Sequence, residues 1–448
     1  MADPRALFAD HLRAVCSGAE EALRTSAERG APFDGILLHS GSAATYHAQD
    51  RPVDFQPVPH FARFAPLRAP DQLIVLRPGA PPRLVRTIPR DFWYEPAEEP
   101  NHPFREHFET LEVGSLAEAE LELGELSRFA YVGSDPDLAR RVGIDPQAIE
   151  PEPLLALLDW QRSLKTRYEI ECIREAARLA GLGHAAALGC AAERASERQI
   201  HAAYLAEAGL LERDTPYTHI VAWDDRSAVL HFETKRTVPP DPGHTFLIDA
   251  GATAHGYASD VTRTHAWPGA HSVFAAALLA LESLQRELVA RIRPGLAYVE
   301  LHEQAARGVC EILSSLGVLR VDADSAFERG IDYPFLPHGV GHHLGLQAHD
   351  VAGDQVAPAG GRRAPPPRFP YLRTTRELAP GQVVTVEPGL YFIPMLLEPH
   401  REGPDRNCFA WDLIDALYPC GGIRIEDDVA VTRDGHEDLS RPFVPGSL

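Results

Sequence analysis

The chain has 448 residues, of which 44% are hydrophobic and 24% are charged, as in an ordinary soluble globular protein of two or three domains. The formal net charge is −21. This excess of acid argues against binding to nucleic acid or to an anionic membrane surface, because both need clustered Lys and Arg.

The composition also bears on the compartment. The charged segment that follows Met1 contains no apolar core of a signal peptide. No run of about 18 apolar residues is present, so we expect no membrane span. The six cysteines lie without CxxC spacing, which is typical of free thiols in a reducing compartment. We therefore expect a cytoplasmic protein.

The first part of the chain alternates helical and extended patterns. Apolar residues at helical spacing predict a helix over residues 5–28. Short apolar runs bounded by Pro, Gly or Asp predict strands at 35–38, 72–76, 83–85 and 129–133. These elements predict an α/β domain over residues 1–158, in which we find no catalytic constellation.

Residues 154–166 are interpreted as the connection to a second domain, which we expect to cover residues 159–448. A long helical pattern runs from Lys165 to Ala187, and Ser196 with Gln199 three residues later predicts the start of another helix. Farther on, the patterns predict strands at 220–223, 228–231, 246–249, 383–392 and 421–431, helices at 272–292 and 299–316, and a loop at 351–370. The class is therefore α+β, with an antiparallel or mixed sheet in the second domain.

The candidate functional residues gather in this second domain. Residues 338–349 place four histidines within twelve positions, separated by glycines that let the backbone approach a ligand closely. Acidic residues that follow predicted strands lie on both sides of this cluster in the sequence. Two Asp, one His and two Glu in this order can hold a pair of divalent metals; the acidic members are Asp249, Asp260, Glu387 and Glu426.

Charge arithmetic favours such a metal pair. Four ionised carboxylates gathered in a cleft repel one another, and two divalent cations cancel their charge. Oxygen-rich ligation with one imidazole suits Mn²⁺, Zn²⁺ or Co²⁺. Two such ions about 3.5–4 Å apart can share a water and lower its pKa. Each motif alone also fits an ordinary turn or surface histidine; their fixed order makes the metal interpretation the stronger one.

In their contexts, these residues resemble the "pita-bread" metallopeptidases, and among them the proline dipeptidases (prolidases, Xaa-Pro dipeptidases) and the similar bacterial organophosphorus acid anhydrolases. The resemblance extends over nearly the full length and includes the segments 91–93, 370–374 and 421–427. It implies a creatinase/prolidase-like N-terminal α/β domain and a C-terminal pita-bread domain, in which duplicated αβ halves surround a curved antiparallel sheet.

The resemblance assigns a role to each metal ligand. Asp249 would bind one metal with both carboxylate oxygens, and Asp260 and Glu426 would bridge the two metals. His342, at the second histidine of the family pattern, and Glu387 would bind the other metal. The implied cofactor is a pair of divalent ions; Mn²⁺ is our first choice, and Zn²⁺ and Co²⁺ are the alternatives.

The resemblance also implies catalytic groups around the metals. His231 and His349 would stabilise the tetrahedral intermediate. Glu387 would accept the proton of the attacking water and pass it to the leaving prolyl nitrogen. His338 would line the substrate pocket, whereas His343 falls at a free position of the pattern and is expected to be structural.

Further residues would recognise the substrate. Arg373 would bind the C-terminal carboxylate of a dipeptide, for which a guanidinium is well suited. Arg424 is a second candidate, with the alternative that it orients a metal-bridging carboxylate or a neighbouring group. Tyr217 and Tyr298 would shape the pocket for the proline ring, and packing in the core is their alternative. Asp50 would reach the site of a partner subunit, since the resemblance implies a homodimer.

The implied function is hydrolysis of dipeptides that end in proline, whose tertiary amide lacks an N–H group. Phosphotriester hydrolysis is a side activity that the resemblance also suggests. Two alternatives remain open at this point. One is an Xaa-Pro aminopeptidase of the same fold, which acts on longer peptides. The other is a catalytically inactive pita-bread module that binds peptides.

Overall fold

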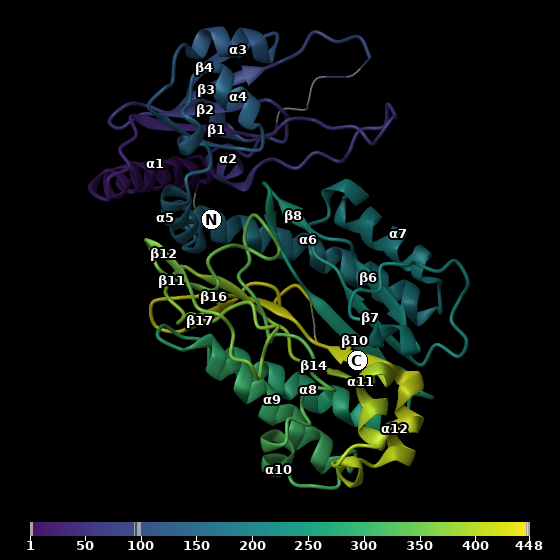
Figure 1. Cartoon of the computed structure of the whole chain (residues 1–448). Coiled ribbons are helices and arrows are strands. Elements are labelled where there is room, and N and C mark those ends of the chain that lie inside the picture. Colours follow the sequence, from purple (N-terminus) through teal and green to yellow (C-terminus); the bar gives the residue numbers. More distant parts are fainter. Residues whose placement is uncertain (1–2, 94, 96–99, 445, 447–448) are drawn as a thin grey trace. The chain divides into compact units, whose positions relative to one another are not determined.

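The computed structural model describes residues 3–93, 95, 100–444 and 446. The chain forms two compact units (Figure 1). The first contains residues 1–162 together with 166–169 and 357–361; the second contains residues 163–165, 170–356 and 362–448.

The first unit is built on a five-stranded sheet with the order β4-β3-β2-β1-β5. Its strands are β1 (Gly35–His39), β2 (Leu73–Leu76), β3 (Arg83–Thr87), β4 (Glu109–Val113) and β5 (Phe129–Val132). β1 pairs antiparallel with β2 and parallel with β5, so the sheet is mixed. The helices of this part are α1 (Pro4–Glu28), α2 (Pro59–Phe64), η1 (Pro103–His107), α3 (Leu116–Leu123), α4 (Pro136–Arg141), η2 (Pro146–Ala148) and α5 (Glu152–Ser163).

Apolar residues of alternating strand positions meet α3 and α4 on one face of this sheet. Leu37 and Val85 of the strands form one buried cluster with Leu123 of α3 and Leu138 of α4. The four predicted strands and the first helix are confirmed, and the α/β character of the N-terminal part is therefore confirmed as well.

The first half of the second unit packs two helices on an antiparallel sheet with the order β10-β7-β6. Trp223 and Phe246 of the sheet are buried against Ala187 and Ile200 of the helices. The elements are α6 (Arg167–Ala192), α7 (Glu197–Ala208), η3 (Glu212–Asp214), β6 (Ile220–Trp223), η4 (Asp224–Ala228), β7 (Thr245–Asp249), β8 (Thr253–Ala254), β9 (Tyr257–Ala258) and β10 (Thr262–Ala266).

The second half repeats this theme with helices on the antiparallel sheet β13-β16-β17. Its elements are α8 (Ser272–Ala290), α9 (Tyr298–Ser315), α10 (Ala323–Glu328), β13 (Val383–Val386), β14 (Gly389–Tyr391), α11 (Pro394–Leu397), η5 (Glu398–Arg401), η6 (Arg406–Cys408), α12 (Trp411–Leu417), η7 (Tyr418–Cys420), β15 (Gly422–Arg424), β16 (Asp427–Val431) and β17 (His436–Asp438). The chain between α10 and β13 also forms the short strands β11 (Gln355–Ala357) and β12 (Gly360–Arg362), whose residues 357–361 belong to the first unit. An antiparallel bridge between Thr262 and Glu426 joins the two halves where β10 begins and β16 is about to begin.

Three sequence-based predictions about elements are wrong in detail. Residues 228–231 are not a strand: Asp224, with φ of 53°, ends β6 and starts the 3-10 turn η4. The connection at 154–166 is largely helical, because α5 runs to Ser163. The loop at 351–370 contains the short pair β11 and β12. Among the described residues, no helix is long and apolar enough to cross a membrane.

The predicted capping of α7 is confirmed. Ser196 accepts the N–H of Gln199 with its hydroxyl, and the side chain of Gln199 accepts the N–H of Ser196 in return. Gly209 ends the helix in the left-handed region, with φ of 69°. These contacts fix the start of a helix that packs behind β6.

We expect Ser196→Ala to destabilise the second unit by about 1 kcal/mol, because a buried helix N-terminus loses its capping acceptor. Differential scanning calorimetry should detect the change as a lower midpoint of one transition. Ser272→Ala is the matched control: Ser272 is the exposed first residue of α8, and we expect a change of no more than about 0.5 kcal/mol. Equal shifts in the two variants would contradict the capping role.

Candidate metal centre

Asp249 is the last residue of β7, where register places it between Ile220 of β6 and Thr262 of β10. Its carboxylate is buried and accepts the Nη2–H of Arg424 through Oδ2 at 2.6 Å. Its Oδ1 atom is buried without a hydrogen-bond partner among the residues that the structure describes. A buried anionic oxygen in this state calls for a cation.

The backbone that follows Asp249 is held from behind by buried polar side chains. The Nε2–H of His184 donates to the carbonyl of Ala250 at 3.0 Å, and the hydroxyl of Tyr204 donates to the carbonyl of Gly251 at 2.8 Å. A Cβ atom on Gly251 would lie 1.9 Å from a neighbouring carbonyl oxygen, so only glycine fits here. The turn that presents Asp249 is therefore rigid.

Asp260 and Glu426 meet at the junction between the two halves. The hydroxyl of Thr262 donates to Glu426 Oε2 at 2.7 Å, and the N–H of Glu426 donates to the carbonyl of Thr262 at 3.1 Å. The N–H of Asp260 donates to the carboxylate of Asp428 at 3.1 Å. The two acidic side chains thus come from one chain crossing with fixed backbone geometry.

His342 and Glu387 complete the group. The Nε2 atom of His342 lies 3.6 Å from Asp260 Oδ2 and 3.5 Å from Glu387 Oε1. Its Nδ1–H donates to the carbonyl of His343 at 3.0 Å, which leaves the Nε2 lone pair directed at the carboxylates. One donor atom each of Asp260, His342 and Glu426 lies within 4.8 Å of the others, and all three side chains are buried.

The pKa values of these groups follow from burial and crowding. Burial, and then the charges of the other carboxylates, raise the pKa values of Asp260 and Glu426 well above their usual range. Burial also raises the pKa of Glu387 to about 8 and lowers that of His342 to about 3. Without cations the acids therefore retain protons and the imidazole stays neutral. Crowded acids and a neutral imidazole are the donor set that fits divalent metals.

Arg424 is fully enclosed next to this donor set. Its Nη2–H donates to Asp249, and its Nη1–H donates to the hydroxyl of Tyr391 at 2.8 Å. That hydroxyl donates in turn to Nε2 of His338 at 3.0 Å. With this geometry Arg424 orients a carboxylate of the centre, which matches the alternative that the sequence left open for it.

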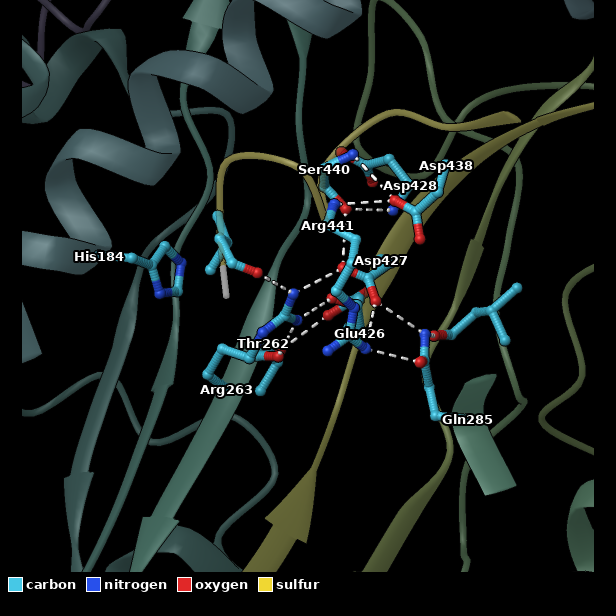
Figure 2. A network of polar contacts seen from close by, with 12 residues as sticks. His184, Thr262, Arg263, Gln285, Glu426, Asp427, Asp428, Asp438, Ser440 and Arg441 are labelled. Carbon is cyan, nitrogen blue, oxygen red and sulfur yellow. Dashed lines mark hydrogen bonds and ion pairs between the residues drawn. The ribbon is translucent and has the colours of Figure 1, made fainter. Parts of the chain in front are cut away.

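A second buried arginine, Arg263, contacts the backbone of Glu426 (Figure 2). Arg263 donates to the carbonyl of Glu426 at 2.7 Å, to Asp427 Oδ1 at 2.7 Å and to the carbonyl of Val444 at 2.7 Å. The guanidinium is 1% exposed and its carboxylate partner 0%. Because Arg263 lies one residue after Thr262, it ties β10 to the backbone of Glu426.

The carboxylate of Asp427 is the centre of the network that Figure 2 shows. It accepts hydrogen bonds from Arg263, from Ser440 at 2.9 Å and from Gln285 at 3.0 Å, and it pairs with Arg441 at 2.7 Å. Segments from α8, β10, β16 and the C-terminal region thus converge directly behind the ligands. Such a satisfied buried network fixes a single arrangement of the backbone.

The other predicted histidines lie around the centre. His338 is partly buried and reaches Glu387, with 3.8 Å between Nδ1 and Oε2. The exposed ring of His349 meets His342 edge-to-face, with 4.3 Å between ring centroids. His231 is exposed in the turn after η4. Burial is the main reason why the pKa values of His338 and His349 are lowered, and the charge of His231 is a smaller one.

Arg373 and Tyr217 also face the centre. Arg373 is exposed, and its charge, after burial, lowers the pKa of His349, which is about 4. The hydroxyl of Tyr217 is buried, and burial followed by the charges of Asp249 and Asp260 raises its pKa well above the usual range. The structure therefore brings these two residues to the carboxylate group.

Two further predicted substrate-binding residues have different settings. Tyr298, in α9, is 0% exposed, and its hydroxyl donates to the carbonyl of Thr385 at 2.5 Å. Burial, and then the charges of Glu387 and Glu426, raise its pKa well above the usual range, so it packs in the core close to the carboxylate group. Asp50 is exposed in the first unit. His343 is buried with Nδ1 donating to the carbonyl of Val351 at 3.0 Å, a structural position.

Several residues that shape the centre were not predicted: Thr262, Arg263, Tyr391, Asp427 and Asp428. Their signals were present in the sequence, since all lie within four residues of a predicted ligand. Two consecutive acids after Glu426 in a strand of buried residues are unusual and indicate buried partners. The partners themselves, such as Ser440, could not be read from spacing.

Two family models match this sequence. The model described as metallopeptidase family M24 matches residues 171–433, and the one described as Xaa-Pro dipeptidase, N-terminal domain, matches residues 6–160. The fold and the site together define a metallopeptidase of the pita-bread class. The chain belongs to metallopeptidase family M24, with the N-terminal domain of the Xaa-Pro dipeptidases.

Individual relatives agree with this classification. The chain is 39% identical over 447 residues to an Xaa-Pro dipeptidase of Stenotrophomonas maltophilia (strain K279a), with 98% of each chain covered. It is 36% identical to Xaa-Pro dipeptidase 2 of Idiomarina loihiensis, with 97% of each covered. Among solved structures, the aminopeptidase PepP of Pseudomonas aeruginosa matches with a TM-score of 0.71, 23% identity and 96% coverage of both chains, which supports the fold.

We expect metal binding to release protons and to tighten as the pH rises towards about 8. The pKa of Glu387 is raised to about 8, so at neutral pH this carboxyl holds a proton that a cation must displace. Isothermal titration calorimetry of the metal-stripped protein with Mn²⁺, in buffers of different ionisation enthalpy, measures the protons released. Affinity that does not change between pH 6 and 8 would contradict this assignment.

Proposed function

We propose that this chain is a dimetal-dependent Xaa-Pro dipeptidase, which hydrolyses dipeptides with C-terminal proline. This proposal rests on Asp260, His342 and Glu426, which come from distant parts of the sequence and each place a donor atom within 4.8 Å of the others, with Glu387 3.5 Å from His342. The charge of Asp249 acts on Asp260 in the same buried group. Membership in family M24 and the relatives named Xaa-Pro dipeptidase support this proposal. Promiscuous phosphotriester hydrolysis belongs to it as a secondary activity.

The metal ligands divide as the family resemblance implies. Asp249 would hold one ion, His342 and Glu387 would hold the other, and Asp260 and Glu426 would be shared by the two. Two divalent ions, when bound, would supply Lewis acidity and a water of lowered pKa. We propose Mn²⁺ as the native metal, with Zn²⁺ and Co²⁺ as alternatives, because most atoms of the donor set are oxygens.

The residues of the chain perform the remaining steps. Glu387 accepts the proton of the attacking water and delivers it to the leaving prolyl nitrogen. This nitrogen needs the proton because it carries no N–H in the tertiary amide. His231 and His349 donate hydrogen bonds to the oxygen that becomes negative. His338 lines the substrate pocket, and the buried hydroxyl of Tyr217 lies beside the proposed position of the substrate's proline ring.

Recognition of the substrate's C-terminus is assigned to Arg373. Its guanidinium is exposed, and its positive charge contributes to lower pKa values of His349 and Glu387. A free carboxylate can accept two hydrogen bonds from such a fork. Arg424 cannot serve in the same way while it is enclosed by Asp249 and Tyr391.

The proposal extends to the organisation of the protein. We infer a homodimer in which Asp50, from the domain formed by residues 1–158, reaches the catalytic domain of the partner, residues 159–448. We also infer a cytoplasmic location, which fits the free cysteines of the described chain. An Xaa-Pro aminopeptidase is the competing function, because aminopeptidases P share the fold. Longer peptides have no carboxylate at the position that Arg373 would bind.

We expect purified protein to hydrolyse Gly-Pro with Mn²⁺ present, to lose this activity after dialysis against a chelator, and to regain it with Mn²⁺. Asp260→Asn should lower kcat by more than about 100-fold, because both metals depend on this side chain. Asp324→Asn, an exposed acid of α10, is the matched control and should retain full activity. A protein that binds two metals and hydrolyses neither Xaa-Pro dipeptides nor Xaa-Pro-Yaa tripeptides would refute the proposed enzyme.

We expect Arg373→Ala to reduce kcat/KM for Gly-Pro by about 10- to 100-fold, since charge-assisted hydrogen bonds to the carboxylate are lost. Turnover of a tripeptide such as Gly-Pro-Ala should change much less. Arg362→Ala, on the exposed strand β12, controls for a general loss of positive charge. A dipeptide-to-tripeptide ratio equal to that of the wild type would assign carboxylate recognition elsewhere and favour the aminopeptidase.

A further inference from the structure

A buried ion pair lies beside the segment that carries His342, His343 and His349. The Nζ of Lys165 is 2.7 Å from Asp350 Oδ2, and the two side chains are 1% and 0% exposed. Removing two charges from water is costly, and apolar residues of similar volume often stabilise a core as well or better. A pair in this setting therefore suggests a role in fixing geometry.

Asp350 closes the loop that follows His343. Its N–H donates to the carbonyl of His343 at 2.9 Å, and its Oδ1 accepts the N–H of Val351 at 2.9 Å. The ring of His343 donates to the carbonyl of Val351 at 3.0 Å. Main chain and side chain thus hold Asp350 at one point, and Lys165 neutralises its carboxylate there.

Both sides of this arrangement are tied to the segment that leads to Glu387. The N–H of Lys165 donates to the carbonyl of Gly381 at 2.7 Å. His343 forms an antiparallel bridge with Val384, at the middle of β13. The ion pair is therefore connected through Gly381 and Val384 to the segment that contains β13 and leads to Glu387.

His349 immediately precedes Asp350 in the chain. The ring of His349 is exposed and meets the ring of His342 edge-to-face, with 4.3 Å between the ring centroids. The space below the loop is closed, because a Cβ atom on Gly345 would lie 2.2 Å from Asp350 Oδ2 and 2.8 Å from Lys165 Cε. Because Asp350 follows His349 directly in the chain, a displaced Asp350 carries the backbone of His349 with it.

We propose that Lys165 and Asp350 are positioning residues that set His349 over the metal centre. This inference rests on the proposed function, in which His349 contacts the substrate. The proposed effect of the pair on the reaction passes through His349, the neighbour of Asp350 in the chain, so removal of the imidazole must abolish that effect.

The test is a double-mutant comparison with Gly-Pro as substrate and Mn²⁺ present. Lys165→Met with Asp350→Asn removes both charges and leaves no unpaired ion. We expect two bound metals, as in the wild type, and a kcat at least about 10-fold lower. In the His349→Ala background the same two substitutions should change kcat by less than about 2-fold.

Arg226→Met with Glu197→Gln is the matched control. It removes another largely buried pair of the same unit, with 2.7 Å between its charged atoms. We expect lower thermal stability and an unchanged kcat. If the Lys165 and Asp350 substitutions leave kcat unchanged, or lower it equally with and without His349, the inference is overturned.

Gly345→Ala provides a second route should the paired substitutions prevent folding. It wedges the pair apart while both charges remain, and it should lower kcat only when His349 is present. Failure of the proposed function is visible separately, as a metal-loaded wild type without activity on Gly-Pro. In that case crystal structures still decide the inference: a His349 ring that keeps its position in the paired variant refutes it.

Discussion

Burial of crowded carboxylates is the constraint on which the rest of this structure depends. Asp260, Glu387 and Glu426 lie close to His342, and burial followed by the charges of neighbouring carboxylates raises their pKa values. The arrangement is consistent only if cations supply the missing charge, as two divalent ions do. The fold of the second unit can be understood as the means of holding these five side chains in place before the cations bind.

Two arginines perform complementary parts of that task. Arg424 pairs with Asp249 within the centre and also donates to the hydroxyl of Tyr391. That hydroxyl donates to His338 and so orients its ring. Arg263 contacts the backbone of Glu426 rather than its carboxylate. The first sets the charge of the donor group, and the second sets its geometry. A lysine would suit neither position, because each guanidinium makes divergent hydrogen bonds.

The sequence predicted most elements, and the residues that gather at the candidate metal centre, because those signals are local. The acids lie at or near strand ends, and the histidine cluster is compact. One failure also has a local cause: the strand predicted at 228–231 was lost to the positive φ of Asp224, which an apolar run does not reveal. For Tyr298 the sequence left a pocket role and core packing open, and the structure places its ring in the core. Contacts such as that between Lys165 and Asp350 join residues 185 positions apart and have no sequence pattern.

The division between a shared centre and variable surroundings explains why the choice of substrate is the finer question. The donor set alone does not select the substrate, and it would serve a dipeptidase and an aminopeptidase equally. What differs between such enzymes is the distance from the cleaved bond to the end of the peptide. In the proposed function that distance is recognised by exposed groups such as Arg373, which the core constrains only indirectly. Selectivity can therefore change by substitutions at the rim while the buried network behind Asp427 stays as it is.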